Sequence, residues 1–231
     1  MPKFLALDTC SEACSAALVV DNQVWGEFKL VGNRHSEVIL SMVQSLLAGG
    51  EIVLGQLDAI GFTRGPGSFT GVRIGTGVVQ GLALGSDLPV IPVSSLALLA
   101  QGADADRGRP WLLPLLDARM GEVYWACYQW QEAGAVIPVS EENVSAVASI
   151  VCDPQLSWQA LGTGAAAYAE QFPTHISELS LGSPESVYPN ARHMKPLLDL
   201  AWKSGDAVAP ENALPLYLRN NVAHKSKPRS Q

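Results

Sequence analysis

The segment GFTRGPGSFTGVRIGTGVVQGLALG, residues 61–85, decides the fold and contains eight glycines, one proline and two charged residues. Its apolar residues from Phe69 to Leu84 have helical spacing, yet each glycine inside a helix costs about 1 kcal/mol relative to alanine. Two explanations are available. The glycines make room for a phosphate group, or they let another backbone approach closely.

The segment does not match either of the common phosphate-binding motifs. The P-loop requires a glycine followed by lysine at a fixed spacing, and no lysine lies in this stretch. The dinucleotide motif G-x-G-x-x-G fails because three residues separate Gly67 from Gly71. The start of the helix still offers free N–H groups to an anion, so weak candidates for a cofactor contact remain: Gly65, Gly67 and Ser68.

The glycines of the predicted helix fall on two stripes. Gly77, Gly81 and Gly85 share one narrow stripe, and Gly71 and Gly75 form a neighbouring one. Small residues four apart allow a second backbone to pack closely, which can offset the cost of glycine in a helix. The pattern favours contact with a neighbouring helix, and we expect a partner-interface that includes Gly71, Gly75, Gly77 and Gly81.

The preceding helix, predicted from Arg34 to Ala48, has an apolar face of roughly 200°, where an ordinary core-facing stripe needs about 100°. Two interpretations stay open. The helix is deeply buried, or one edge packs on its own sheet while the other meets a partner subunit. The second interpretation adds these residues to the predicted interface: Val38, Ile39, Met42, Val43 and Leu46.

The order of predicted elements indicates an α/β protein of two lobes with mixed sheets flanked by helices. The chain has 231 residues, is 48% hydrophobic and 16% charged, and can bury a large core. A three-stranded meander at 4–30 opens the first half, and a strand–turn–strand unit at 111–130 opens the second. Helices alternate with strands after each. A charged stretch near 104–110 predicts the boundary between an N-terminal lobe, 1–105, and a C-terminal lobe, 106–231.

Charge and composition exclude several classes of protein. A net charge of −7 argues against a chain that binds nucleic acid by itself. No apolar run approaches the ~18 residues of a membrane span, and the first residues lack the pattern of a signal peptide. The four cysteines contain no C-x-x-C pair and the four histidines are scattered, so we expect no metal site. The expected location is cytoplasmic, without membrane contact.

Three motifs carry a resemblance to a known family. GPGSFTGVRIG (65–75), DARMGEVYWA (117–126) and LPLYLRNNVAHK (214–225), together with LALDT (5–9), resemble the TsaB family, also called YeaZ, over nearly the whole chain. The resemblance implies the two-lobed fold of the actin/Hsp70-like kinase superfamily (ASKHA). It also implies a part in forming N6-threonylcarbamoyladenosine at position 37 of tRNAs that read codons beginning with A.

The resemblance further implies a division of labour. A TsaB-like chain would be a non-catalytic subunit that scaffolds and activates its paralogue, the TsaD transferase, together with the TsaE ATPase. It would meet tRNA only within that complex. Separately, the wide apolar surface of the two predicted helices leads us to expect that the isolated chain self-associates as a homodimer through them. It would hold no cofactor of its own, with ATP used by the complex. The metal-binding histidines of TsaD are replaced here by Ser95 and Leu99, which cannot act as imidazole ligands, so no catalytic residue is expected.

Two turns of the kinase fold remain to be interpreted. Asp8 and Thr9 occupy the first phosphate-binding turn and are weak candidates for a cofactor contact, while Asp117 opens the second turn. Each aspartate can instead cap its own turn by accepting backbone N–H bonds. Arg73 and Arg119 either form structural ion pairs with Asp117 or Glu122, or contact a partner or an anion. The alternative function is a free-standing enzyme that binds ATP between its lobes.

Overall fold

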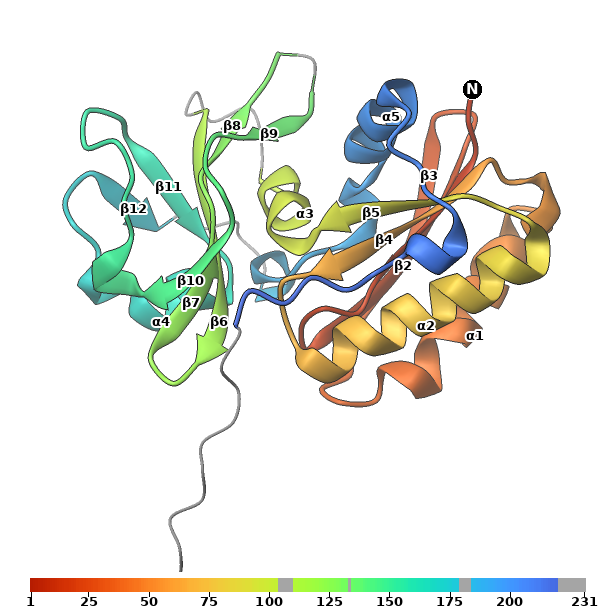
Figure 1. The fold of residues 1–231 in the computed structure, drawn as a ribbon, viewed down its shortest axis with the longest axis horizontal. Helices are drawn as coiled ribbons and strands as arrows, with labels where there is room; N and C mark the ends of the chain where they lie inside the picture. The colour runs from red at the N-terminus through yellow and green to blue at the C-terminus, as the bar shows by residue number, and fades with distance from the viewer. Residues whose placement is uncertain (104–109, 133, 179–183, 220–231) are drawn as a thin grey trace, which may run out of the picture.

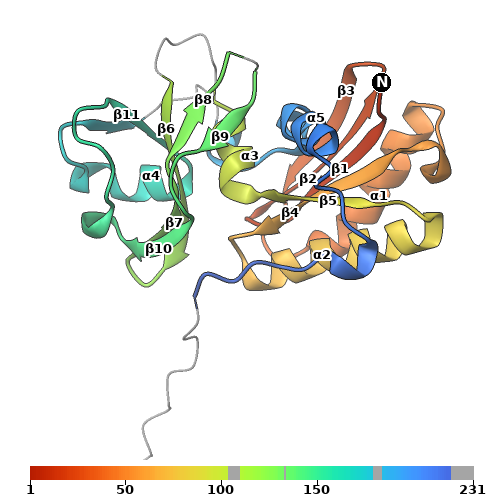
Figure 2. The same ribbon diagram turned by 45° about the horizontal axis from the view of Figure 1, so that its top comes forward.

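A computed structural model of the chain describes residues 1–103, 110–132, 134–178 and 184–219. Within these residues the chain forms two lobes, each built around one β-sheet (Figures 1 and 2). Both sheets contain parallel and antiparallel pairs. The predicted α/β architecture with mixed sheets is therefore confirmed. No helix in the described part of the chain is both long and apolar enough to cross a membrane.

The first lobe holds a five-stranded sheet in the order β3-β2-β1-β4-β5. The strands are β1 (Phe4–Asp8), β2 (Ala13–Val20), β3 (Gln23–Leu30), β4 (Ala59–Gly65) and β5 (Val90–Ser94). The first three form an antiparallel meander, and β4 and β5 extend the sheet in parallel from β1. All five residues of β1 are buried because helices cover both faces of the sheet. This explains the unbroken apolar run FLAL.

Two helices cover one face of this sheet and lie side by side (Figure 1). The first, α1, spans His35–Gly49 and therefore differs by one residue at each end from its predicted range. The second, α2, spans Phe69–Ser86 and begins at the predicted residue. A short 3-10 helix, η1 (Leu54–Gln56), precedes β4. Local periodicity thus located both helices accurately.

The apolar face of α1 is buried against its own sheet. Ile39 and Met42 are fully buried, Val43 and Leu46 are nearly so, and all four join the core formed with β1, β2 and β4. Val38 is half-buried against the same core. The prediction that these five side chains form a partner surface is corrected, because they already pack inside the lobe.

The other face of the first sheet is covered by α3 (Ser95–Gln101) and by α5 (Lys195–Ser204). Met194 and Leu198 are fully buried there, in the same cluster as Phe4. The chain therefore returns to the first lobe after building the second sheet. The prediction that 106–231 forms the second lobe alone is corrected, since helical periodicity does not indicate which sheet a helix will cover. The predicted boundary lies mostly at 104–109, outside the described residues.

The second lobe holds a seven-stranded sheet in which β10-β7-β6-β11-β12 form the main order and β8 and β9 branch from β6. Its strands are β6 (Trp111–Arg119), β7 (Glu122–Trp125), β8 (Tyr128–Trp130), β9 (Val136–Pro138), β10 (Asn143–Ala146), β11 (Trp158–Leu161) and β12 (Ile176–Glu178). Its helical elements are α4 (Thr163–Tyr168) and the 3-10 helices η3 (Val147–Ser149), η4 (Ala169–Gln171) and η5 (Pro184–Val187). Two further 3-10 helices, η6 (Ala191–His193) and η7 (Pro210–Asn212), pack on the first lobe. The single return strand predicted at 122–130 is split into β7 and β8.

Candidate functional site

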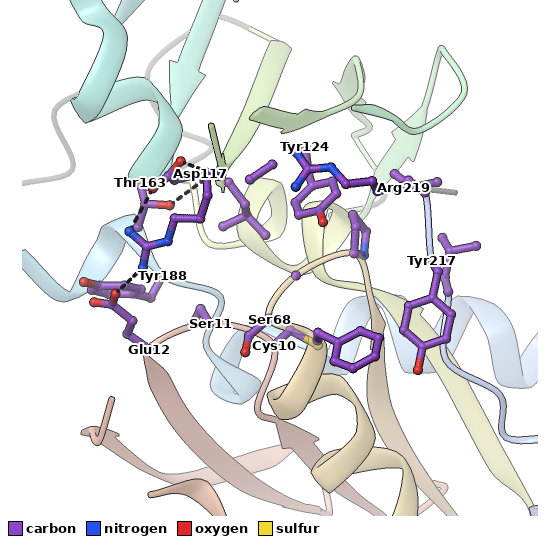
Figure 3. Close-up of a pocket in the computed structure, with 18 of the residues that line it drawn as sticks. Cys10, Ser11, Glu12, Ser68, Asp117, Tyr124, Thr163, Tyr188, Tyr217 and Arg219 are labelled. Atoms are coloured by element: carbon purple, nitrogen blue, oxygen red, sulfur yellow. Dashed lines mark hydrogen bonds and ion pairs between the residues drawn. The ribbon is translucent and has the colours of Figure 1, made fainter. Parts of the chain in front are cut away.

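A cleft of about 730 Å³ opens between the two lobes (Figure 3). Its walls come from the β1–β2 loop, the loop that enters α2, the hairpin between β6 and β7, and the segment that follows η7. In Figure 3, Glu12 and Asp117 lie at one end of the cleft and Tyr217 and Arg219 at the other. Both ends are therefore lined by charged or aromatic side chains.

The glycines at the start of α2 admit the chain's own β1–β2 loop. A Cβ on Gly71 would overlap the carbonyl oxygen of Thr9, and a Cβ on Gly75 would overlap the hydroxyl of the same residue. Thr9 Oγ1 donates a hydrogen bond to Gly71 O at 2.8 Å. Close backbone approach is thus the correct explanation for these two glycines. Their assignment to a partner surface is corrected, because the approaching backbone belongs to this chain.

The loop before α2 is fastened to the same strand end. Gly67 packs against the carbonyl group of Cys10, which accepts a hydrogen bond from the Ser68 N–H at 2.7 Å. Ser68 is the N-cap of α2, and its Oγ accepts from Gly71 N at 3.3 Å. Gly67 and Ser68 line the cleft, whereas Gly65 is buried beside Leu216. Only two of these three candidate residues therefore face the cleft.

Asp8 is buried beneath the floor of the cleft, with 1% of its surface exposed. Its Oδ1 accepts hydrogen bonds from Thr63 Oγ1 at 2.6 Å and from Cys10 N at 3.3 Å, and its Oδ2 has no hydrogen-bond partner. Burial raises the pKa of this carboxyl from 3.8 to about 7, against the opposing effect of the Thr63 hydrogen bond. Asp8 therefore caps its own turn, as one of the two interpretations expected. It has no access to a ligand in the cleft.

The aspartate of the second turn, Asp117, bonds to both the backbone and the side chain of Arg119. Asp117 Oδ1 accepts from Arg119 N at 2.8 Å, and Asp117 Oδ2 pairs with Arg119 Nη1 at 3.3 Å. The same guanidinium reaches across to Glu12 in the first lobe, at 3.1 Å (Figure 3). Arg119 thus forms an ion pair with Asp117, as one interpretation expected, but this pair is exposed and extends between the lobes. Among the described residues no group of three or more His, Cys, Asp or Glu could hold a metal ion.

Arg73 lies between two aromatic rings at the other end of the cleft. Its guanidinium carbon is 3.4 Å from the centroid of the Phe69 ring, and its Nε donates to Tyr217 Oη at 2.8 Å. The ring centroids of Phe69 and Tyr217 are 5.7 Å apart. In the described part of the chain Arg73 pairs with neither Asp117 nor Glu122, so the ion pair suggested for it from sequence is wrong.

Two ion pairs at the cleft were not expected from the sequence: the Arg119–Glu12 pair described above and a second pair formed by Arg219. Arg219 pairs with Glu122 of β7, although 97 positions separate them in the chain. The motif LPLYLRNNVAHK marked the segment only through its family resemblance. No periodicity or local pattern indicated that its arginine would reach the second lobe.

The remaining glycines of α2 face outward. Gly77 and Gly81 are exposed, and a Cβ built on either residue, or on Gly85, meets nothing within 4 Å. The exposed apolar side chains Leu84 of α2 and Leu40 of α1 are 64% and 48% accessible. This part of the predicted partner surface stays a prediction, now restricted to the outer face of α2.

Comparisons with known proteins agree over most of the chain. The family model described as "TsaD: tRNA N6-adenosine threonylcarbamoyltransferase" matches residues 29–225. The chain is 43% identical to the tRNA threonylcarbamoyladenosine biosynthesis protein TsaB of Escherichia coli (strain K12), over 98% of both chains. A protein of the same name from Haemophilus influenzae is 36% identical, over 97% of this chain and 96% of that one.

A solved structure, "YeaZ from Pseudomonas aeruginosa", matches with a TM-score of 0.85 and 39% identity, covering 94% of this chain and all of that one. The match extends through both lobes. Together with the family model, it confirms the actin/Hsp70-like kinase superfamily fold expected from the sequence.

Proposed function

The chain belongs to the TsaB (YeaZ) family, and on that premise we propose that it is a non-catalytic subunit that scaffolds and activates the TsaD transferase. Its membership places it in the biosynthesis of tRNA threonylcarbamoyladenosine. In the proposed complex the TsaE ATPase is the third protein, and the modified base is position 37 of tRNA. The chain meets tRNA only there, holds no cofactor of its own, and leaves the use of ATP to the complex.

The outward glycine stripe of α2 carries this proposal. Gly77 and Gly81 each weaken the helix by about 1 kcal/mol relative to alanine, and the isolated lobe gains no packing from either. A second helix that crosses this stripe would approach the backbone closely and recover the cost through van der Waals contact. Leu84, three residues after Gly81 on the same helix, is exposed and supplies apolar area beside the crossing point. A partner subunit explains these three residues together.

The state of the two aspartate turns supports a subunit without its own phosphate chemistry. Asp8 is buried and capped by Thr63 and Cys10, and the Asp117 carboxylate is matched by Arg119. The backbone of Thr9 fills the space beside Gly71 where a phosphate would otherwise approach the helix. The groups that a kinase-fold enzyme would use are thus committed to holding the fold.

Substitution of the outward glycines tests the proposal. We expect Gly77→Leu and Gly81→Leu to abolish co-purification with TsaD and tRNA modification, because leucine holds the partner helix away. Their melting temperatures should stay close to wild type. The matched control is Ala166→Leu, a similar enlargement at an exposed position of α4. Retention of TsaD by both glycine variants would overturn the proposal.

The cleft keeps a second candidate function open: a free-standing enzyme that binds ATP between its lobes. Its volume of about 730 Å³ and its arginines, Arg73, Arg119 and Arg219, favour binding of an anionic ligand of nucleotide size. Calorimetry with ATP and Mg²⁺ on the isolated chain distinguishes the two candidates. Micromolar binding with turnover would favour the enzyme, and absence of turnover would favour the subunit.

A further inference from the structure

We propose that residues 214–219 form a strap that sets the width of the interlobe cleft by fastening α2 of the first lobe to β7 of the second. The strap belongs to neither sheet. It runs from the first lobe to the second lobe (Figures 1 and 2). Leu216 and the three residues after it line the cleft.

The beginning of the strap is anchored to the first lobe through its backbone. Ala213, directly before it, is fully buried, and its carbonyl oxygen accepts from Gln80 Nε2 of α2 at 3.1 Å. Three residues later, Leu216 N donates to the carbonyl oxygen of Arg64 in β4 at 2.8 Å. These bonds hold the strap to a strand and a helix of the same lobe, so this end moves with the first lobe.

The middle of the strap is anchored by a side-chain cluster. Tyr217 packs its ring beside Phe69 and accepts a hydrogen bond from Arg73 Nε. The guanidinium of Arg73 is in turn stacked on Phe69 at 3.4 Å. Phe69 is the first residue of α2. The direction in which the strap leaves the first lobe is therefore set by the start of that helix.

The end of the strap is fastened to the second lobe by the ion pair between Arg219 and Glu122. The side chains of these residues are 20% and 38% exposed, so water screens the pair only in part. On the neighbouring strand of the same β6–β7 hairpin, Arg119 pairs with Glu12 of the first lobe, and these side chains are 74% and 60% exposed. Exposed pairs contribute little. The pair of the strap is therefore the stronger of the two ion pairs that fasten the hairpin.

This arrangement makes the strap a latch. The hairpin forms one wall of the cleft, and it is held from both sides by groups that belong to, or are anchored on, the first lobe. Rotation of the second lobe away from the first must break the Arg219–Glu122 pair or pull Tyr217 from its cluster. A ligand or partner that binds either residue would thereby change the opening of the cleft.

Single-molecule energy transfer between the lobes measures the proposed effect. Gln44 of α1 and Ala167 of α4, both exposed, are each replaced by cysteine and labelled with donor and acceptor dyes. Cys152 is replaced by serine so that it does not take up dye. The other three cysteines are buried and do not compete for dye. At single-molecule concentrations copies of the chain do not associate. For the wild type we expect one narrow distribution of energy-transfer efficiency.

Four variants then test the latch. Arg219→Ala and Glu122→Gln should each broaden the distribution and shift it toward lower transfer, and the charge swap Glu122→Arg with Arg219→Glu should restore it. Tyr217→Phe, which removes only the acceptor for Arg73, should broaden it less. The matched control is Lys195→Ala, which breaks an ion pair with Asp199 inside one helix and should change nothing.

Melting curves confirm that each variant is folded. An unchanged distribution in both Arg219→Ala and Glu122→Gln would overturn the proposal, and so would a charge swap that stays as broad as the single variants. The measurement uses the isolated chain without TsaD. Loss of partner binding in the glycine variants and loss of the latch are therefore distinguishable.

Discussion

The hydroxyl of Thr9 donates a hydrogen bond to the carbonyl oxygen of Gly71, and the Thr9 carbonyl oxygen fills the place where a Cβ of Gly71 would stand. Strand β1 thus ends directly against the first turn of α2. A side chain at position 71 would separate the two elements. This contact explains why the helix has a glycine so near its start.

The first prediction concerns the two kinds of glycine in α2. Gly71→Ala should lower the free energy of unfolding by about 1–3 kcal/mol or more, because the added Cβ overlaps backbone that cannot easily move. Gly77→Ala should raise it by up to about 1 kcal/mol, since its Cβ meets open space and alanine favours the helix. Urea denaturation of both variants measures the difference. Equal effects at the two positions would contradict the packing described for Thr9.

The second prediction concerns the buried carboxyl of Asp8. Its pKa in the folded chain, about 7, is above the ordinary value of 3.8, so the folded state binds the proton more tightly than the unfolded state. The resulting stabilisation is fully present below about pH 4 and is lost as pH rises through about 7. We expect the wild type to lose a few kcal/mol of stability across that range from this group, at about 1.4 kcal/mol per pKa unit.

Asp8→Asn tests this dependence. Asparagine keeps an oxygen that can accept from Thr63 and Cys10 but does not titrate. The free energy of unfolding of the variant should therefore vary less with pH between about 4 and about 7 than that of the wild type. Urea titrations at several pH values provide the comparison. Parallel pH profiles for the two proteins would show that Asp8 does not titrate in this range.

A third prediction follows from the cap of α2. Ser68→Ala removes the oxygen that accepts from Gly71 N and should cost about 1 kcal/mol of stability. Ser41→Ala is the matched control, because Ser41 is exposed within α1 and its hydroxyl donates to Val38 O of its own helix. Its effect should stay within about 0.5 kcal/mol. Chemical denaturation measures both, and equal losses would argue against the cap.

The fourth prediction concerns self-association. The isolated chain should form a homodimer through the outer face of α2, because exposed apolar surface of this kind is seldom left uncovered. Leu84→Glu should shift light scattering at high micromolar concentration from dimer toward monomer without lowering the melting temperature. Leu200→Glu makes the same change at an exposed position of α5 and should leave the dimer intact. A wild-type chain that scatters as a monomer would refute this expectation.

The fifth prediction concerns tRNA. The isolated chain should bind tRNA weakly and with strong dependence on salt, since its net charge is −7. Its basic cluster at 224–229 lies outside the described residues. Fluorescence anisotropy with labelled tRNA at low and physiological salt gives the affinity. Tight binding at physiological salt would mean that the chain contacts tRNA without its partners.

Much of the fold could be predicted from local patterns. The bounds of α1 and α2 and the turn at Asp117 all depend on residues within a few positions of each other. Periodicity, cap chemistry and turn chemistry act over that distance, which is why the sequence alone was sufficient for these features. The family motifs extended this to the overall class of fold.

Other features depended on packing between distant segments. Periodicity orders the side chains around a helix, but the packing of the whole lobe sets how the helix is rotated against its sheet. Only the tertiary structure therefore separated Gly71, which faces Thr9, from Gly77, which faces outward. It also showed that α5 packs on the first lobe and that Arg219 pairs with Glu122. A pattern within one segment carries no information about contacts with a segment nearly a hundred residues away.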